Sequence, residues 1–110
     1  MISKELMGLV SPHGENEILR MNIEGNRLEI LYEIGGWGSI NLDTLGRMCK
    51  EWCLTKGYTL NSGPRLNGTF MTKVDSDLHS VTLYNNYVGS TEVAAIINAS
   101  KWVMEQRDDS

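Results

Sequence analysis

A two-residue loop, Gly25-Asn26, lies between two runs in which apolar and polar residues alternate, and no other feature constrains the fold as strongly. The runs are Ile18–Glu24 and Arg27–Ile34, and a loop of this kind tolerates the positive φ that a tight hairpin needs. Because the pattern and the turn agree, we predict a β-hairpin in a fixed register. The expected pairs are Glu24 with Arg27, Ile23 with Leu28, Met21 with Ile30 and Leu19 with Tyr32, which places Leu19, Met21, Ile23, Leu28, Ile30, Tyr32 and Ile34 on one face.

A helix is expected after this hairpin, because the spacing of apolar residues changes from two to about 3.6. It runs from about Leu42 to Lys56, with Asn41 or Ser39 as its cap and Gly57 at its end. Its apolar side carries Leu42, Leu45, Cys49, Trp52 and Cys53.

Three extended stretches follow, and then a second helix. The stretches are Tyr58–Asn61, Thr69–Val74 and Ser80–Tyr84. The last helix begins after Gly89, with Ser90 as its N-cap, and continues to about Gln106. The segment Ser3–Val10 is compatible with a short helix or an edge strand. We therefore predict one α+β domain over residues 1–110, a five-stranded, mostly antiparallel sheet with two helices on one face, in the order β-β-α-β-β-β-α.

The composition disfavours several classes of partner. The chain has 110 residues with 14 acidic and 10 basic side chains, a formal net charge of -4 that repels phosphate backbones and anionic lipids. The sequence lacks the long apolar stretch that a secretory signal or a membrane span requires, so we expect neither. We expect a cytoplasmic protein that does not bind membranes, and nucleic acid is a disfavoured partner, although a local basic patch stays open.

Residues that could carry chemistry are few. Cys49 and Cys53 are four apart on one face of the expected helix, without the two-residue spacing of redox motifs and most zinc sites, so we interpret them as core. The segment Asp75–His79 alternates potential ligands but lacks the glycine and the closing glutamate of a calcium loop, so we interpret it as a solvated hairpin loop. We predict no metal and no cofactor.

Catalytic motifs are also missing. No serine lies in a G-x-S-x-G elbow, and His13 and His79 are the two histidines of the chain. Paired-carboxylate chemistry stays open, because the separations of the many acids are unknown from sequence. We predict that the protein is not an enzyme.

Two junctions between strands and helices are the candidate binding sites. Gly35–Ser39 joins the hairpin to the first helix, where free N–H groups could bind an anion, although glycines that let the chain turn explain it more simply. Asn85-Asn86-Tyr87 occupies the equivalent place before the last helix. If both junctions lie at one end of the sheet, they form a polar and aromatic rim. The candidate ligand- or partner-binding residues are Trp37, Ser39, Tyr84, Asn85, Asn86 and Tyr87.

These junctions suggest a repeat of two ββα units, with Trp52 in one helix and Trp102 in the other. The alignment needs gaps and depends on few residues, so we interpret it as chance.

The last helix has more apolar surface than one sheet needs. Its main apolar face carries Val93, Ile96, Ile97, Val103 and Met104, whereas Ala95, Ala99 and Trp102 form a second stripe. Small residues beside a tryptophan permit close approach of another helix, so we predict a protein contact, most simply a homodimer, at Ala95, Ala99 and Trp102. The alternative is that the N-terminal segment covers this stripe.

The stretch Ser90–Ser100 resembles the first helix and turn of helix-turn-helix regulators, with Ala94 in the helix and Asn98 as the turn residue. The resemblance covers less than a fifth of the chain and implies a recognition helix from about Lys101. That segment contains Glu105, Asp108 and Asp109, which argue against binding in a DNA groove.

We therefore expect a small acidic interaction protein, such as an adaptor or inhibitor, that binds a protein partner or itself as a homodimer through the C-terminal helix. The alternatives are a small-molecule-binding domain that uses the rim and a helix-turn-helix-like DNA-binding regulator.

Overall fold

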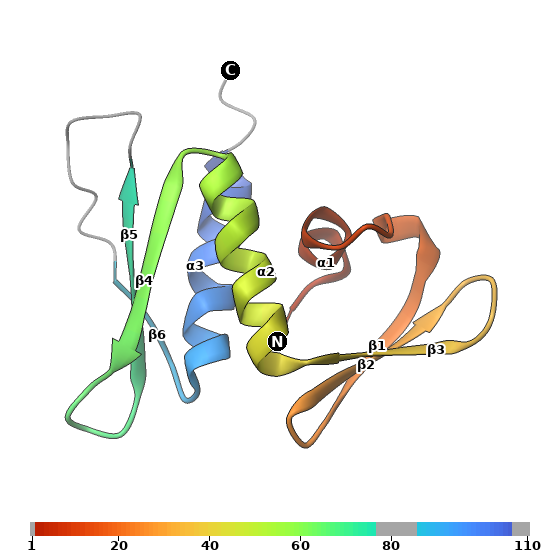
Figure 1. Ribbon diagram of the computed structural model, residues 1–110, viewed down its shortest axis with the longest axis horizontal. Coiled ribbons are helices and arrows are strands. Elements are labelled where there is room, and N and C mark those ends of the chain that lie inside the picture. Colours follow the sequence, from red (N-terminus) through yellow and green to blue (C-terminus); the bar gives the residue numbers. More distant parts are fainter. Residues whose placement is uncertain (1, 77–85, 107–110) are drawn as a thin grey trace.

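A computed structural model describes residues 2–76 and 86–106 of the protein, and their fold is α+β, as predicted (Figure 1). Along the chain the elements are α1 (Lys4–Val10), η1 (Glu15–Glu17), β1 (Ile18–Glu24), β2 (Arg27–Tyr32), β3 (Trp37–Asn41), α2 (Leu42–Thr55), β4 (Tyr58–Pro64), β5 (Phe70–Ser76), β6 (Asn86–Gly89) and α3 (Glu92–Gln106). None of the described helices is long and apolar enough to cross a membrane.

The strands form two sheets of three, so the prediction of one five-stranded sheet is wrong. Sheet A has the order β1-β2-β3 and sheet B the order β4-β5-β6, both antiparallel. The reason is a missed strand, β3, at a place that we interpreted as a glycine-rich junction. Gly35 and Gly36, at φ +89° and +93°, turn the chain back onto β2. The predicted strand Ser80–Tyr84 lies outside the described residues, and the third strand of sheet B is β6.

The helices lie between the sheets, which corrects the prediction of two helices on one face. Figure 1 shows α2 and α3 side by side, with sheet B on one side of them and sheet A, together with α1, on the other. The segment left open by the sequence is the helix α1, capped by Ser3, whose Oγ accepts from the Leu6 N–H at 3.2 Å. The order β-β-β-α occurs twice, as β1 to α2 and as β4 to α3.

The predicted hairpin register is confirmed next to the loop and changes at its far end. Gly25 has φ +59°, and Glu24 pairs with Arg27, Ile23 with Leu28 and Met21 with Ile30. An irregularity at Leu19 then puts Ile18, and not Leu19, opposite Tyr32. As a result Ile18 is buried, whereas Leu19 is 50% exposed and Ile34, in the following turn, is 96% exposed.

The helix ends match the predicted caps only in part. Asn41 caps α2 through its Oδ1, which accepts from the Asp43 N–H at 2.8 Å, and Gly57 at φ +89° follows the helix end. At α3, Thr91 takes the place predicted for Ser90, because its Oγ1 accepts from the Ala94 N–H at 3.2 Å. The helix continues through Asn98, so the helix-turn-helix resemblance is wrong at its turn.

Helix α3 is covered on two sides, and this explains its second apolar stripe. Ile96 and Val93 face α2, where a Cβ on Gly46 would lie 3.2 Å from Ile96 Cδ1. Trp102, on the other stripe, packs against Tyr58 and Tyr87 of sheet B, with ring centroids 5.5 and 6.4 Å away. The buried core contains Leu6, Met7, Ile18, Leu28, Ile30, Leu45, Cys49, Cys53, Leu60, Val74, Ile97, Ala99 and Val103 among others.

Candidate functional site

The outer face of sheet A, which points away from the core, carries the exposed residue Trp37. The strand register places Arg20 opposite Leu31, and Leu31 opposite Trp37, so the three form one row across the sheet. Trp37 is 55% exposed, and the Arg20 guanidinium lies 5.6 Å from the centroid of its indole ring. A cation over an aromatic face holds the ring in one orientation by a weak electrostatic attraction. The exposed Ile34 lies in the turn between β2 and β3, next to this row in the chain.

The remaining outer face of sheet A is polar. Arg27 donates from Nε to Ser39 Oγ at 2.7 Å, and Ser39 Oγ donates to Glu29 Oε1 at 3.3 Å. Arg27 and Glu29 also form an ion pair at 3.9 Å. These contacts tie β2 to β3 on the side of the Trp37 row that is nearer the Gly25 turn. The combination of an aromatic and an arginine with a polar surround is typical of a protein-binding surface.

The structure separates the other residues of the predicted rim from Trp37. Trp37 and Ser39 lie on β3 of sheet A, whereas Asn86 and Tyr87 lie on β6 of sheet B (Figure 1). Tyr87 packs against Trp102, which makes it part of the contact between α3 and sheet B. Tyr84 and Asn85 lie outside the described residues. The two junctions are therefore on different sheets, and Trp37 and Ser39 are the pair that the fold brings together.

The predicted dimer contact on α3 loses its basis in this fold. Ala95 and Ala99 have no exposed area, and Trp102 is half-buried. Sheet B and α2 pack against α3 more extensively than the N-terminal helix α1, which also contacts it. Because the chain itself buries the second stripe, no surplus of apolar surface at these residues calls for a second molecule.

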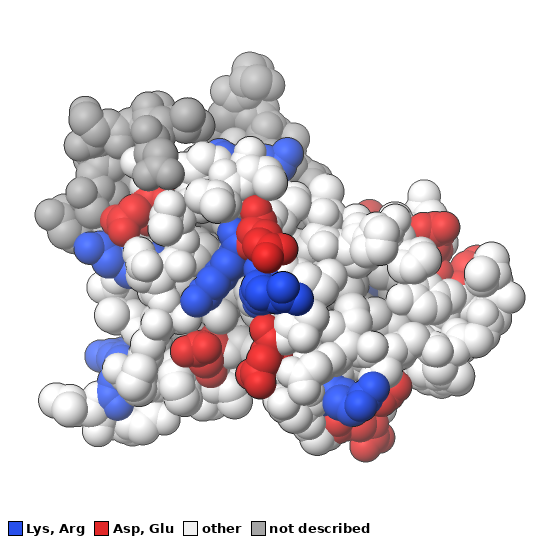
Figure 2. Space-filling view, viewed as in Figure 1, with Lys and Arg blue, Asp and Glu red and all other residues white. Residues whose placement is uncertain are grey.

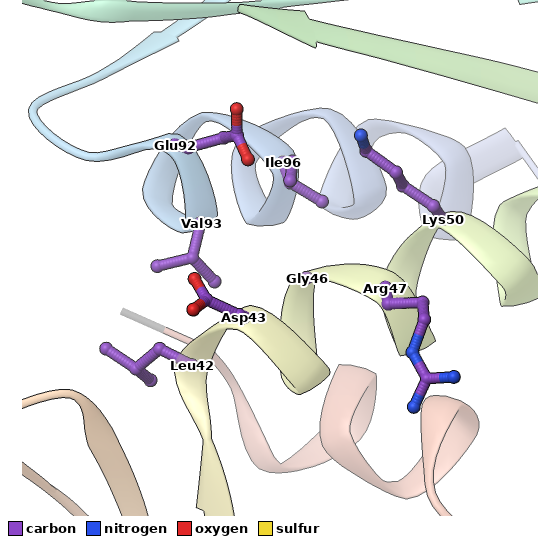
Figure 3. A pocket seen from close by; sticks show the side chains of 8 residues that line it. All are labelled: Leu42, Asp43, Gly46, Arg47, Lys50, Glu92, Val93 and Ile96. Carbon is purple, nitrogen blue, oxygen red and sulfur yellow. The ribbon is translucent and has the colours of Figure 1, made fainter.

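A hollow of about 290 Å³ lies between α2 and α3 (Figure 3). Its lining residues are Leu42, Asp43, Gly46, Arg47, Lys50, Glu92, Val93 and Ile96. Gly46 lets the two helices approach closely, because a side chain there would meet Ile96. The sequence analysis did not single out this site. A glycine in the middle of an amphipathic helix, which costs helix stability, was the available signal.

The charges around this hollow balance. Asp43 and Glu92 lie in the first turns of α2 and α3, where acids are favoured by the helix dipole. Arg47 pairs with Glu51 at 4.0 Å, and Lys50 has no ion pair within the described part of the chain. Figure 2 shows acidic and basic side chains interleaved over the helices in the middle of the view. The hollow therefore selects no ion of one sign.

The candidate reactive groups are either buried or dispersed. Burial raises the pKa of Cys49 to about 12 and that of Cys53 to about 11, so both thiols stay protonated near neutral pH. Cys53 donates to Ser100 Oγ at 3.5 Å, and Ser100 donates to the Ile96 carbonyl at 2.8 Å, which links α2 to α3. Among residues 2–76 and 86–106, no three His, Cys, Asp or Glu side chains gather as metal ligands.

His13 lies at the surface. Its Nδ1 is 3.7 Å from Glu17 Oε2, and its ring centroid is 4.7 Å from that of Tyr32. Asp75 is near the end of β5, where it contacts Lys73 at 3.9 Å, whereas Asp77 and His79 lie outside the described residues.

Comparison with known proteins adds no relative: no family model, no curated protein and no solved structure matches this chain.

Proposed function

We propose that the protein is a non-enzymatic interaction module that binds a protein partner through the outer face of sheet A around Trp37. The observation that carries the proposal is the row of Arg20, Leu31 and Trp37, whose two ends are exposed, because tryptophan and arginine supply much of the binding energy at protein interfaces. The row lies on a rigid three-stranded sheet, so its geometry exists before a partner arrives.

The acidic net charge fits a partner with a basic or neutral surface. With a formal charge of -4, the molecule as a whole attracts cationic surfaces and repels phosphate. On the outer face of sheet A, Glu29 and Glu24 lie one and two rows away from Trp37. A partner that places an apolar residue against Trp37 and a base near Glu24 would satisfy this face. We therefore propose an adaptor or inhibitor role in the cytoplasm.

Site-specific crosslinking tests the proposed surface. A photoreactive amino acid at position 37 should crosslink to a discrete protein in native lysate, and the same group at Leu66 should not. Leu66 is a matched control, because it is fully exposed and apolar but lies in the turn between β4 and β5 of sheet B. Trp37→Ala should then weaken binding of the crosslinked partner by about 2 kcal/mol or more, roughly 30-fold. Equal crosslinking from both positions would contradict the proposal.

The second candidate, a small-molecule-binding domain, has its best support in the hollow between α2 and α3. It combines an apolar floor of Val93 and Ile96 with charged groups of both signs, a lining suited to a small zwitterion. Free amino acids are the simplest probes. In a thermal-shift assay an amino acid that binds the hollow should stabilise the wild type and Trp37→Ala but not Lys50→Met. This result would favour small-molecule binding over protein binding.

A further inference from the structure

Strand β1 is an edge of sheet A, with no strand of the described residues on its outer side. Among the described residues it pairs with β2 alone, and it is seven residues long with no proline or glycine. The two edges of sheet B differ, since β4 ends in Gly63-Pro64 and β6 has four residues. Short edges and prolines block the addition of another strand, and β1 has neither protection.

The ladder of sheet A fixes which backbone groups of β1 are free. Tyr32 N–H donates to the Gly36 carbonyl at 3.2 Å, and Leu42 N–H donates to the Asn26 carbonyl at 2.9 Å, so the even-numbered residues of β2 bond toward β3. Because direction alternates along a strand, the odd-numbered ones bond toward β1. Their partners there are Arg20, Asn22 and Glu24.

It follows that the N–H and C=O groups of Met21 and Ile23 point away from sheet A. The regular part of β1 lies between the irregularity at Leu19 and the turn at Gly25, and its central residue is Asn22. An antiparallel copy of the same segment, placed about Asn22, would let Met21 and Ile23 exchange hydrogen bonds with Ile23 and Met21 of that copy. Both free residues on each chain would thereby be satisfied.

The side chains of this segment complement a second copy. In the register centred on Asn22, Arg20 lies opposite Glu24 of the second copy on the outer face, twice per pair of molecules. On the inner face Met21 lies opposite Ile23 of the second copy. Cross-strand pairs of opposite charge and of apolar residues stabilise antiparallel strands, whereas pairs of like charge destabilise them.

Neighbouring registers lack this match. Centring on Ile23 places Glu24 opposite Asn22, and centring on Met21 extends the pairing into the irregularity at Leu19. At the other edge of sheet A, pairing of β3 about Ser39 places Trp37 opposite Asn41 and matches no charges. The register about Asn22 is the one that uses both free backbone residues and both charges.

A hollow of about 290 Å³ lies beside this edge, lined by Ile2, Met21, Asn22, Ile23 and Leu28. Ile23 is 38% exposed although it lies on the inner face of the sheet. The apolar side chains of an added strand would pack in this region. We infer that two copies of the protein associate by antiparallel pairing of their β1 strands about a twofold axis at Asn22, which makes a continuous six-stranded sheet.

Arg20 changes contact in this arrangement. In the single chain its guanidinium lies over Trp37, and in the pair it would reach the opposite way, to Glu24 of the second copy. The side chain is exposed, so this reorientation needs no repacking of the core. The inference does not depend on the partner proposed for Trp37, since it concerns self-association of the purified chain.

A cysteine at the axis tests the register directly. Asn22 would face Asn22 of the second copy at a non-hydrogen-bonded position, where Cα atoms are about 4.5 Å apart, a separation that a disulfide spans. Asn22→Cys should therefore form a disulfide-linked dimer under mild oxidation. Ser39→Cys, on the outer face of the opposite edge, is the matched control and should stay largely monomeric. Equal crosslinking of both variants, or of neither, would overturn the inference.

Charge reversal provides a second test that does not use oxidation. Arg20→Glu and Glu24→Arg each place like charges opposite one another in the homodimer, and each should raise the dissociation constant in sedimentation velocity by about tenfold. An equal mixture should associate more tightly than either variant alone, because the mixed dimer has two attractive pairs. A mixture that associates no better than its components would contradict the register. Circular dichroism of each variant checks that these exposed substitutions leave the fold intact.

Discussion

Sheets A and B have the same size and topology but differ in how the rest of the chain covers them. α3 lies along the inner face of sheet B, where Trp102 packs between Tyr58 and Tyr87. Sheet A is covered at Ile18, Leu28 and Ile30, whereas Ile23 and Met21 near the hairpin end are partly open. One β-β-β-α unit therefore covers its sheet fully with its own helix, whereas the other leaves part of its sheet uncovered.

The two surfaces proposed above, the Trp37 row and the β1 edge, both lie in the less covered unit. The Trp37 row and the β1 edge both belong to the unit whose helix, α2, packs mainly against α3 and β4 and not over its own sheet. The short helix α1 contacts β1, but the inner face of sheet A is less covered than that of sheet B. The position of α2 therefore leaves the hairpin end of sheet A, at Met21 and Ile23, partly open.

The strongest test of this comparison replaces a tryptophan in each unit. Trp102→Ala should lower the free energy of unfolding by about 2 to 4 kcal/mol, because it removes a ring packed between α3 and sheet B. Trp37→Ala should lower it by less than about 1 kcal/mol, because the ring is mostly exposed. Urea titration of both variants measures the difference. Equal losses would mean that sheet A depends on Trp37 for its stability.

Glycine-to-alanine substitutions compare the two units through a smaller expected loss of stability. A Cβ on Gly89 would lie 2.5 Å from the Ala95 backbone nitrogen, and one on Gly38 would lie 2.7 Å from Cε2 of the Tyr32 ring. Backbone in a helix cannot move aside, so Gly89→Ala should cost about 1 to 3 kcal/mol. Tyr32 is partly exposed and can rotate away, so Gly38→Ala should cost less.

Gly63→Ala is the control for this pair, since a Cβ there would meet nothing within 4 Å. It shares sheet B with Gly89 and should leave the urea midpoint nearly unchanged. If Gly38→Ala proves as costly as Gly89→Ala, the inner face of sheet A is packed as tightly as that of sheet B, and the comparison fails.

The sequence predicted those elements whose signals are local. The Gly25-Asn26 turn with its alternating flanks gave the hairpin register, and the spacing of Leu45, Cys49 and Cys53 gave the buried side of α2. Both depend on neighbours in the chain. The burial of the two cysteines was also predicted, because small apolar thiols on an amphipathic face normally pack inward.

What the sequence did not reveal depends on tertiary contacts. β3 contains Gly38 and Ser39, which are small and are common in turns. Its pairing with β2 depends on the chain reversal at Gly35-Gly36, which the sequence pattern did not indicate. The stripe of Ala95 and Ala99 indicated that another surface packs there, which is correct, but sequence cannot tell a second molecule from a second sheet of the same chain. The Arg20 contact with Trp37 joins strands that are not adjacent and left no pattern.

The buried thiols between α2 and α3 give a third, pH-dependent test. Burial raises the pKa of Cys49 in the folded protein from 9.0 to about 12, so the unfolded chain loses this proton first as the pH rises. The stability from this group is fully present below pH 9 and is lost between pH 9 and about 12. Between pH 8 and pH 10 the wild type should lose about 1 kcal/mol more stability than Cys49→Ala. Equal losses would mean that the thiol is accessible in the folded state.

The smallest expected effect concerns the contact that connects the two surfaces of sheet A. Arg20→Ala and Trp37→Ala should show a coupling of about 0.5 to 1 kcal/mol in a double-mutant cycle on the free energy of unfolding, the value of an exposed cation over a ring. The control cycle combines Arg20→Ala with Leu66→Ala. It should show no coupling, because Leu66 lies in the turn between two strands of the other sheet. The cycle is measured at low protein concentration, where the chain is a monomer.

If Arg20 leaves the ring when β1 strands pair, the coupling should fall as the concentration rises, because the guanidinium then contacts Glu24 of the second copy. A coupling that is independent of concentration would mean that Trp37 holds Arg20 in both states and that the two surfaces act separately.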